Sequence, residues 1–333
     1  MSFSLQRFFA RYNGFLRTVK GAYVLNNLLN AGVLARNRAL YNRYGLKKSI
    51  FSPISSKDFK THNADIPWID RPEALSQLKN RPGYAALPVD VQEQVGLFIE
   101  QGFMVLKQFA PSQSIDALNQ EIDGVLENGA TGFNYTGRKI FNLFETSTLA
   151  DQDFLRRPQL LQVLEFLLGK SILPFQTLNF TLGSEQRPHS DLIHMTTEPR
   201  GYMIAVWYAL EDCTKWNGPV VYYPGSHKLP FVGTEDYPSG DSTFLVGNNS
   251  NARYEDKIAA VIAQNDLKAV PFLAKKGDIL IWHSNLIHGG SPIKGVSGHK
   301  VTRKSMVCHY FTEEVICYHE MLHRPALIKH IPQ

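Results

Sequence analysis

Two histidines and one aspartate stand at positions where they could share a metal ion. The motif Pro188-His189-Ser190-Asp191 supplies His189 and Asp191 two positions apart. In an extended chain, residues i and i+2 point to the same face, so this imidazole and this carboxylate can converge on one ion. Short triplets also arise by chance, and a surface turn would explain this one. The motif therefore needs a third ligand from elsewhere in the chain.

A later strand candidate, near residues 278–283, leads into a turn that carries His288-Gly289-Gly290. Glycines beside a ligand permit a close approach of the backbone around a metal. Two neutral imidazoles and one carboxylate on one face of iron(II) form the facial triad, which leaves positions open for an oxidant and a co-substrate. We therefore predict that His189, Asp191 and His288 bind iron(II).

His283, at the end of the same strand candidate, is a competing ligand. Its neighbours are bulky, and a lone histidine on an apolar strand is more often a satisfied core residue than a ligand. We predict that His283 is packed in the protein interior.

Short β-rich runs separated by Gly, Pro and Asn surround these residues. This pattern of short strands is typical of a β-sandwich or double-sheet barrel. With the helices described next, it predicts a mainly β fold with flanking helices (α+β). Strands are predicted near residues 172–182, 201–210, 219–223, 268–273, 278–283 and 302–311.

Helices precede the strands. The spacing of apolar residues and the capping signals predict helices over Val89–Gln101, Ser112–Asn128 and 153–168, with a short strand at Phe103–Leu106. Residues 51–85 are punctuated by prolines and are predicted to be irregular. Residues 231–267 have few hydrophobic runs and are predicted to be a lid-like insert or binding loop.

Taken together, the motifs resemble the phytanoyl-CoA dioxygenase family of iron(II)- and 2-oxoglutarate-dependent oxygenases. The resemblance runs from about residue 90 to 311 and rests on four motifs in order: His189-Ser190-Asp191, the segment 209–227 ending in Pro-Gly-Ser-His, the Gly277-Asp278 strand that leads to His288, and Arg303. It implies a double-stranded β-helix, a jelly-roll or cupin-like core, with iron at one open end. It also implies 2-oxoglutarate and dioxygen as co-substrates, and it identifies no catalytic residue beyond the metal centre.

Four further residues are expected to bind 2-oxoglutarate through this resemblance. Arg303 shares one face of a predicted strand with His309, and its planar guanidinium can grip a carboxylate with two parallel hydrogen bonds, which favours it over Lys304. Trp207 and Lys139 match the family's co-substrate pocket by spacing. Members of the family place a hydroxyl two positions after the distal histidine, where this chain has Gly290, so Ser291 is the nearest equivalent.

The reaction implied by the resemblance is hydroxylation of an unactivated C–H bond in a small-molecule or lipid-like substrate, with release of succinate and carbon dioxide. Because Asp191 fills the carboxylate position, no site is left there for a halide, and halogenation is disfavoured. Desaturation, cyclisation and epimerisation remain open with the same ligands. A non-catalytic relative of the same fold that only binds a ligand is an alternative.

The tail holds a motif of a different class of enzyme. His319-Glu320-Met321-Leu322-His323 satisfies the HExxH pattern of zinc peptidases, in which a helix presents both histidines to zinc. Pro325 follows almost at once, and too little chain remains for the usual third ligand. We treat the motif as an unfavoured alternative.

Basic charge is concentrated at the start of the chain. Residues 1–50 hold nine of the 35 Lys and Arg residues and no Asp or Glu, whereas the other 283 residues carry 26 basic and 30 acidic groups. Aromatic and basic residues alternate near 3–20 at helical spacing, which predicts a basic amphipathic helical segment preceding a domain over 51–333. This helix could pack on the domain or on a second subunit, lie on an anionic membrane surface, or direct the chain to an organelle.

Bulk composition excludes several classes of protein. The chain has 333 residues and 44% hydrophobic content, enough for a substantial core, and no apolar run long enough to span a bilayer. Three cysteines, an odd number without paired spacing, favour a reducing compartment such as the cytoplasm. No recognition motif accompanies the basic residues, so a nucleic-acid partner is not expected. The oligomeric state cannot be read from the sequence.

Overall fold

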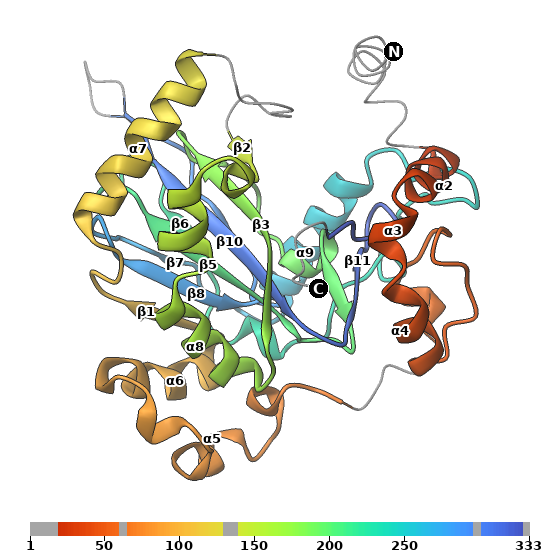
Figure 1. The fold of residues 1–333 in the computed structure, drawn as a ribbon, viewed down its shortest axis with the longest axis horizontal. Helices are drawn as coiled ribbons and strands as arrows, with labels where there is room; N and C mark the ends of the chain where they lie inside the picture. Colours follow the sequence, from red (N-terminus) through yellow and green to blue (C-terminus); the bar gives the residue numbers. More distant parts are fainter. Residues whose placement is uncertain (1–18, 60–64, 129–138, 296–300, 329–333) are drawn as a thin grey trace.

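The computed structural model describes residues 19–59, 65–128, 139–295 and 301–328. A six-stranded antiparallel sheet dominates the fold, with neighbouring strands in the order β1, β8, β5, β10, β3, β2 (Figure 1). Its strands are β1 (Phe103–Leu106), β2 (Lys139–Phe141), β3 (Ile172–Phe180), β5 (Met203–Ala209), β8 (Ile279–His283) and β10 (Ser305–Thr312).

Two three-stranded sheets complete the β structure. One joins β12 (Arg324–Pro325), β11 (Ile316–His319) and β4 (Thr196–Glu198). The other joins β7 (Val270–Pro271), β6 (Val220–Tyr222) and β9 (His288–Gly290). Antiparallel sheets with flanking helices agree with the predicted double-stranded β-helix of α+β class.

The large sheet separates a helical layer from a cavity. Side chains alternate along a strand, so Val206 and Tyr208 of β5 enter the core shared with the helices, whereas Ala205 and Trp207 enter a second core on the other face. The helical layer consists of α6 (Val89–Gln101), α7 (Ser112–Glu127) and α8 (Pro158–Leu168), on one side of the sheet in Figure 1.

The predicted helix ends are set by glycine and proline. Gly102 and Gly169, which follow α6 and α8, adopt positive φ of 82° and 70°, where glycine avoids the strain of a Cβ. The helix predicted over 153–168 is two elements, a π-helical turn at Ala150–Leu155 and then α8. Pro158 occupies the first turn of α8, because a proline in a helix interior would lack its hydrogen bond and clash with the preceding turn.

The segment 231–267 departs from the predicted loop. It contains the helix α9 (Ser250–Gln264), which buries Tyr254 and Ile258. These two residues, four positions apart, are the core-facing stripe of an otherwise polar helix, and the polar composition concealed it. The region 51–85 contains the short helix α5 (Ala74–Gln77) and several 3₁₀ turns.

The N-terminal helices are α2 (Lys20–Leu29), α3 (Ala31–Leu34) and α4 (Asn37–Arg43). Leu34 and Tyr41 pack with Ile316 and Tyr318 of β11, and Figure 1 places these helices beside β11, opposite the helical layer. The predicted amphipathic stretch before Val19 lies outside the described residues. In the described ranges, no helix is both long enough and apolar enough to cross a membrane.

Candidate metal centre

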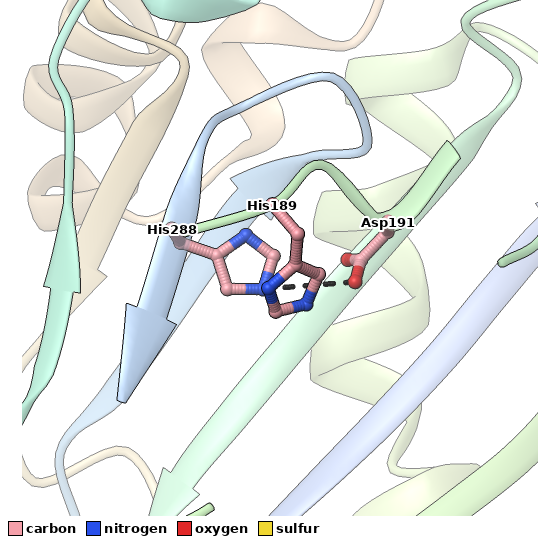
Figure 2. Close-up of side chains that lie close together, drawn as sticks. All are labelled: His189, Asp191 and His288. Carbon is pink, nitrogen blue, oxygen red and sulfur yellow. Dashed lines mark ion pairs between the residues drawn. The ribbon is translucent and has the colours of Figure 1, made fainter. Parts of the chain in front are cut away.

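His189, Asp191 and His288 converge on one point (Figure 2). Each offers a ligand atom, and these three atoms lie within 4.8 Å of one another. All three side chains are buried. The distance from His288 Nε2 to Asp191 Oδ1 is 3.6 Å. The predicted triad is thus assembled in space from a turn after β3 and from β9.

A local backbone pairing sets the two imidazoles side by side. The amide of His189 donates to the carbonyl of His288 at 2.8 Å, and the amide of His288 donates back to His189 at 2.9 Å. The ring centroids are 4.6 Å apart. A Cβ at Gly289 would lie 2.9 Å from the carbonyl oxygen of Gln186, so this position requires glycine, as the sequence predicted.

Each imidazole is held in the tautomer that suits a metal ligand. His189 Nδ1 donates to the carbonyl of Arg187 at 2.9 Å, and His288 Nδ1 donates to the carbonyl of Leu286 at 3.0 Å. With the proton on Nδ1, Nε2 keeps its lone pair for an ion. Backbone carbonyls that bind the second ring nitrogen are a common support of metal-bound histidine.

The pKa values of His189 and Asp191 favour the protonation states that suit metal ligands. Burial, followed by the neighbouring His288, lowers the pKa of His189 well below its usual value, so this imidazole is neutral. Burial alone would raise the pKa of Asp191. Nearby imidazoles, led by His288, and a hydrogen bond from Trp282 outweigh burial and lower the pKa of this carboxyl. A neutral His189 imidazole beside an ionised Asp191 carboxylate suits the binding of iron(II).

The triad lies in a cavity of about 550 Å³ that Arg303, Trp207 and Lys139 also line. Arg303 is 2% exposed, and its Nε and Nη1 atoms have no hydrogen-bond partner among the described residues. Burial lowers its pKa to about 10, which still leaves it charged at neutral pH. A buried cation without a partner is costly, so this site fits an anionic ligand.

The other residues predicted for the co-substrate lie at different places. Trp207 is buried beside Arg303, with 5.7 Å from the guanidinium carbon to the ring centroid, and its Nε1 also has no partner in the described part of the chain. Lys139 Nζ lies 5.8 Å from the ring centroid of Phe180. Ser291 is half-buried, pairs its amide with the carbonyl of Pro219, and is not among the residues that line the cavity. Lys304, by contrast, pairs with Asp123 at 2.7 Å and does not line the cavity.

Sequence reasoning missed several polar residues of the cavity. Trp282 donates its indole hydrogen to Asp191 Oδ2 at 2.7 Å, and His309 Nε2 lies 3.9 Å from the same oxygen. His194 follows Asp191 by one short 3₁₀ turn, and its ring centroid is 5.6 Å from that of His189. The signal available was strand alternation, which places His309 on the face of Arg303.

His283 is a packed interior residue, as predicted. It is 4% exposed, its Nε2 lies 3.3 Å from Asp70 Oδ2, and its ring is 5.5 Å from that of His227.

The HExxH motif is not a peptidase site. His319 ends β11, and the following residues form turns, with His323 at a positive φ of 52°, so the two histidines do not share a helix face. Glu320 is fully buried and accepts hydrogen bonds from Ser56 and Thr234. A carboxylate with both oxygens engaged in this way is structural and does not act as a general base.

Comparisons with known proteins agree with this geometry. A family model described as phytanoyl-CoA dioxygenase matches residues 98–300. Human peroxisomal phytanoyl-CoA dioxygenase is 22% identical over 241 residues, which cover 66% of this chain and 67% of that protein. The probable phytanoyl-CoA dioxygenase of Caenorhabditis elegans is 22% identical over 253 residues, 68% of this chain and 77% of that protein.

Among solved structures, the non-heme α-ketoglutarate-dependent carbocyclase SnoK from nogalamycin biosynthesis is similar in fold. Its TM-score is 0.52 at 14% identity, over 71% of this chain and 88% of that chain. The family model covers more than half of the sequence, and the triad and the buried guanidinium have the required chemistry. The chain belongs to the phytanoyl-CoA dioxygenase family of iron(II)- and 2-oxoglutarate-dependent oxygenases.

Proposed function

We propose that this oxygenase hydroxylates an unactivated C–H bond of a small-molecule or lipid-like substrate, with succinate and carbon dioxide as co-products. The observation that carries the proposal is the buried guanidinium of Arg303, whose Nε and Nη1 have no hydrogen-bond partner among the described residues, in the cavity that holds the histidines and the aspartate. In this proposal His189, Asp191 and His288 hold iron(II), and Arg303 receives the distal carboxylate of 2-oxoglutarate. Iron and 2-oxoglutarate, when bound, would supply the oxidising chemistry together with dioxygen, one atom of which would enter succinate as carbon dioxide is lost and the other the hydroxylated substrate.

The protein's part is orientation and exclusion of water. Leu178, Phe180 and Val307 line the cavity beside Arg303 and leave few polar groups to compete for the carboxylate. Trp207 offers a buried N–H for a second hydrogen bond to the co-substrate. Lys139, half-buried on β2, adds positive charge at the same end. Ser291 does not line the cavity, and the proposal assigns it no contact with the co-substrate.

The test is iron-dependent succinate release from 2-oxoglutarate under air, with candidate substrates added in turn. If the protein is an enzyme, succinate release requires iron(II). Asp191→Ala should abolish the release, whereas Asp212→Ala, at an exposed carboxylate, should retain it. A relative that only binds a ligand would release no succinate under any condition, and that result would overturn the proposal. Iron in place of zinc in the purified protein excludes the peptidase alternative.

The N-terminal region supports a second proposal, peripheral contact with an anionic membrane. Leu25, Leu28 and Leu29 of α2 are 57%, 50% and 79% exposed, and residues 1–50 contain no acidic residue. The three cysteines are buried and free, in keeping with a cytoplasmic location, although the human relative is named as peroxisomal. Co-sedimentation with phosphatidylserine vesicles but not with phosphatidylcholine vesicles is the expected result. Binding to neither kind of vesicle, or equal binding to both, would contradict the proposal.

A further inference from the structure

The helix α9 contacts both the cavity and the turn that carries two of the metal ligands. The metal-ligand turn, defined as residues 187–191, supplies His189 and Asp191. Asn251 at the start of α9 lines the cavity, and Tyr254, one turn later, is 1% exposed and packs against the metal-ligand turn. This position allows α9 to act on the metal centre without supplying a ligand.

Ser190, the residue between the two ligands, is held by neighbours on two elements. Its amide donates a hydrogen bond of 3.0 Å to the hydroxyl of Tyr254, and its carbonyl accepts one from the same hydroxyl at 3.5 Å. Its own hydroxyl donates to the carbonyl of Ser284, just after β8, at 3.0 Å. Because Ser190 and Tyr254 are buried, bulk water does not readily replace these partners.

An ion pair also joins the metal-ligand turn to α9, at the surface. Arg187 Nη2 lies 2.8 Å from Asp256 Oδ1, and Arg187 Nη1 lies 3.4 Å from Glu255 Oε2. The side chains of Arg187 and Asp256 are 49% and 70% exposed, and exposed ion pairs contribute little to stability. The buried contact of Tyr254 is therefore better able to fix the position of the turn.

The backbone conformation of Ser190 decides where the two ligands point. Ser190 has φ −102° and ψ 143°, an extended conformation, and a 3₁₀ turn begins directly after it at Asp191. In extended chain, residues i and i+2 point to the same face, so this conformation directs His189 and Asp191 to one side. A contact that holds Ser190 extended thus also holds the two ligands together.

We propose that Tyr254 is a positioning residue of the metal centre, whose hydroxyl holds Ser190 in the conformation that directs the two ligands of the turn toward iron(II). The inference rests on the proposed function, in which His189 and Asp191 are iron ligands. Without the hydroxyl, the amide of Ser190 loses its partner and the turn relaxes. Iron(II) binding must then order the turn again, which weakens affinity, since a preorganised site binds more tightly than one that must be ordered.

Thermodynamic linkage makes this contact act in both directions. If α9 orders the metal-ligand turn for iron(II), then iron(II) bound to the turn stabilises α9 by the same free energy. A hydroxyl that only satisfies a buried amide would bind it equally well with and without iron(II), and α9 would not respond to the metal. Hydrogen exchange of the backbone amides of α9 therefore separates a positioning role from a purely structural one.

The experiment titrates iron(II), without oxygen, into the full-length wild type, Tyr254→Phe and Tyr237→Phe. Tyr237→Phe is the matched control. Tyr237 is buried, and its ring centroid lies 5.8 Å from that of Tyr254, but its hydroxyl forms its hydrogen bond of 3.1 Å with Ser250 of α9 instead of with the metal-ligand turn. Tyr254→Phe should lower iron(II) affinity about ten-fold, and Tyr237→Phe should leave it unchanged.

In the wild type, iron(II) should slow hydrogen exchange more in α9 than in α7, which belongs to the helical layer and reports general stabilisation by a bound metal. This difference should shrink in Tyr254→Phe and persist in Tyr237→Phe. Equal iron(II) affinity of the two variants, or equal slowing of α9 and α7 in the wild type, would overturn the inference. The wild-type measurement decides the question even if Tyr254→Phe does not fold. A wild-type protein that binds no iron(II) would overturn both the inference and the proposed function.

Discussion

The indole of Trp282 donates a hydrogen bond of 2.7 Å to Asp191 Oδ2, and both residues are buried. Trp282 lies on β8 of the large sheet, whereas Asp191 lies on the turn that follows β3. One carboxylate oxygen is thus engaged by the protein, and Oδ1 lies nearest to His288. This arrangement orients the single acidic ligand of the triad.

Trp282→Phe should therefore weaken iron(II) binding about ten- to a hundred-fold, the usual effect of losing a hydrogen bond that orients a metal ligand. Phenylalanine keeps an aromatic ring at this position, although a smaller one, and lacks the N–H donor. Anaerobic titration with iron(II) measures the change. Trp216→Phe, at a tryptophan that is 46% exposed, should bind iron(II) as the wild type does. Unchanged affinity in Trp282→Phe would mean that the hydrogen bond does not orient the ligand.

Arg303→Met should weaken 2-oxoglutarate binding about ten- to a hundred-fold, because charge-assisted hydrogen bonds contribute about 1.5–3 kcal/mol. The free energy of unfolding without ligand should not fall, since the variant removes a buried guanidinium whose Nε and Nη1 form no hydrogen bond within the described part of the chain. Calorimetry and urea unfolding measure the two quantities. Lys304→Met, which removes the adjacent cation that pairs with Asp123, should leave 2-oxoglutarate affinity unchanged. A destabilised Arg303→Met protein with normal affinity would assign Arg303 a structural role.

The meeting of His189, Asp191 and His288 could be predicted because each sits in a local motif: a His and an Asp two positions apart, and a His followed by two glycines. The residues that orient them could not. Trp282 and Asp191 are 91 positions apart, and only the pairing of the strands brings them together. Spacing within one strand predicts a shared face, but it says nothing about which strand lies opposite.

Prediction of the fold was limited in the same way, because local patterns do not contain contacts between distant segments. Five strands of the large sheet, β1, β3, β5, β8 and β10, were predicted within a few residues, whereas β2, β4, β9, β11 and β12, which have two to four residues each, were missed. Such short strands have too little periodicity to stand out from turns. The tail was considered for an HExxH helix, yet Ile316 to His319 form a strand because they pair with Thr196–Glu198. That pairing is a tertiary contact that no local pattern contains.

Glu320→Gln should lower the free energy of unfolding by about 1–3 kcal/mol, because an amide nitrogen would replace one of the two acceptor oxygens and leave a buried donor unsatisfied. Urea unfolding gives the value. Glu314→Gln, at an exposed surface carboxylate, should change stability by less than about 1 kcal/mol. A Glu320→Gln protein of normal stability would remove the structural role assigned to this residue.

His227 should make the metal-free protein less stable in acid. Burial, followed by the nearby His283, lowers the pKa of His227 to about 3. In the unfolded chain a histidine titrates near pH 6.5, so between about pH 6.5 and pH 3 the unfolded state binds a proton that the folded state does not. The stability that this neutral imidazole contributes is complete above about pH 6.5 and is lost as the pH falls toward 3.

His227→Gln keeps a side chain that can donate to the carbonyl of Ile99, which His227 Nε2 contacts at 3.3 Å, but it cannot titrate. The free energy of unfolding of the variant should therefore decline less steeply between pH 6.5 and pH 4, by a difference on the order of 1–3 kcal/mol at pH 4. Urea unfolding of the metal-free wild type and variant at each pH gives the two curves. Buried histidines that do not contact His227 contribute equally to both proteins and cancel in the difference. Parallel curves, offset by the same amount at every pH, would show that His227 acts through packing alone.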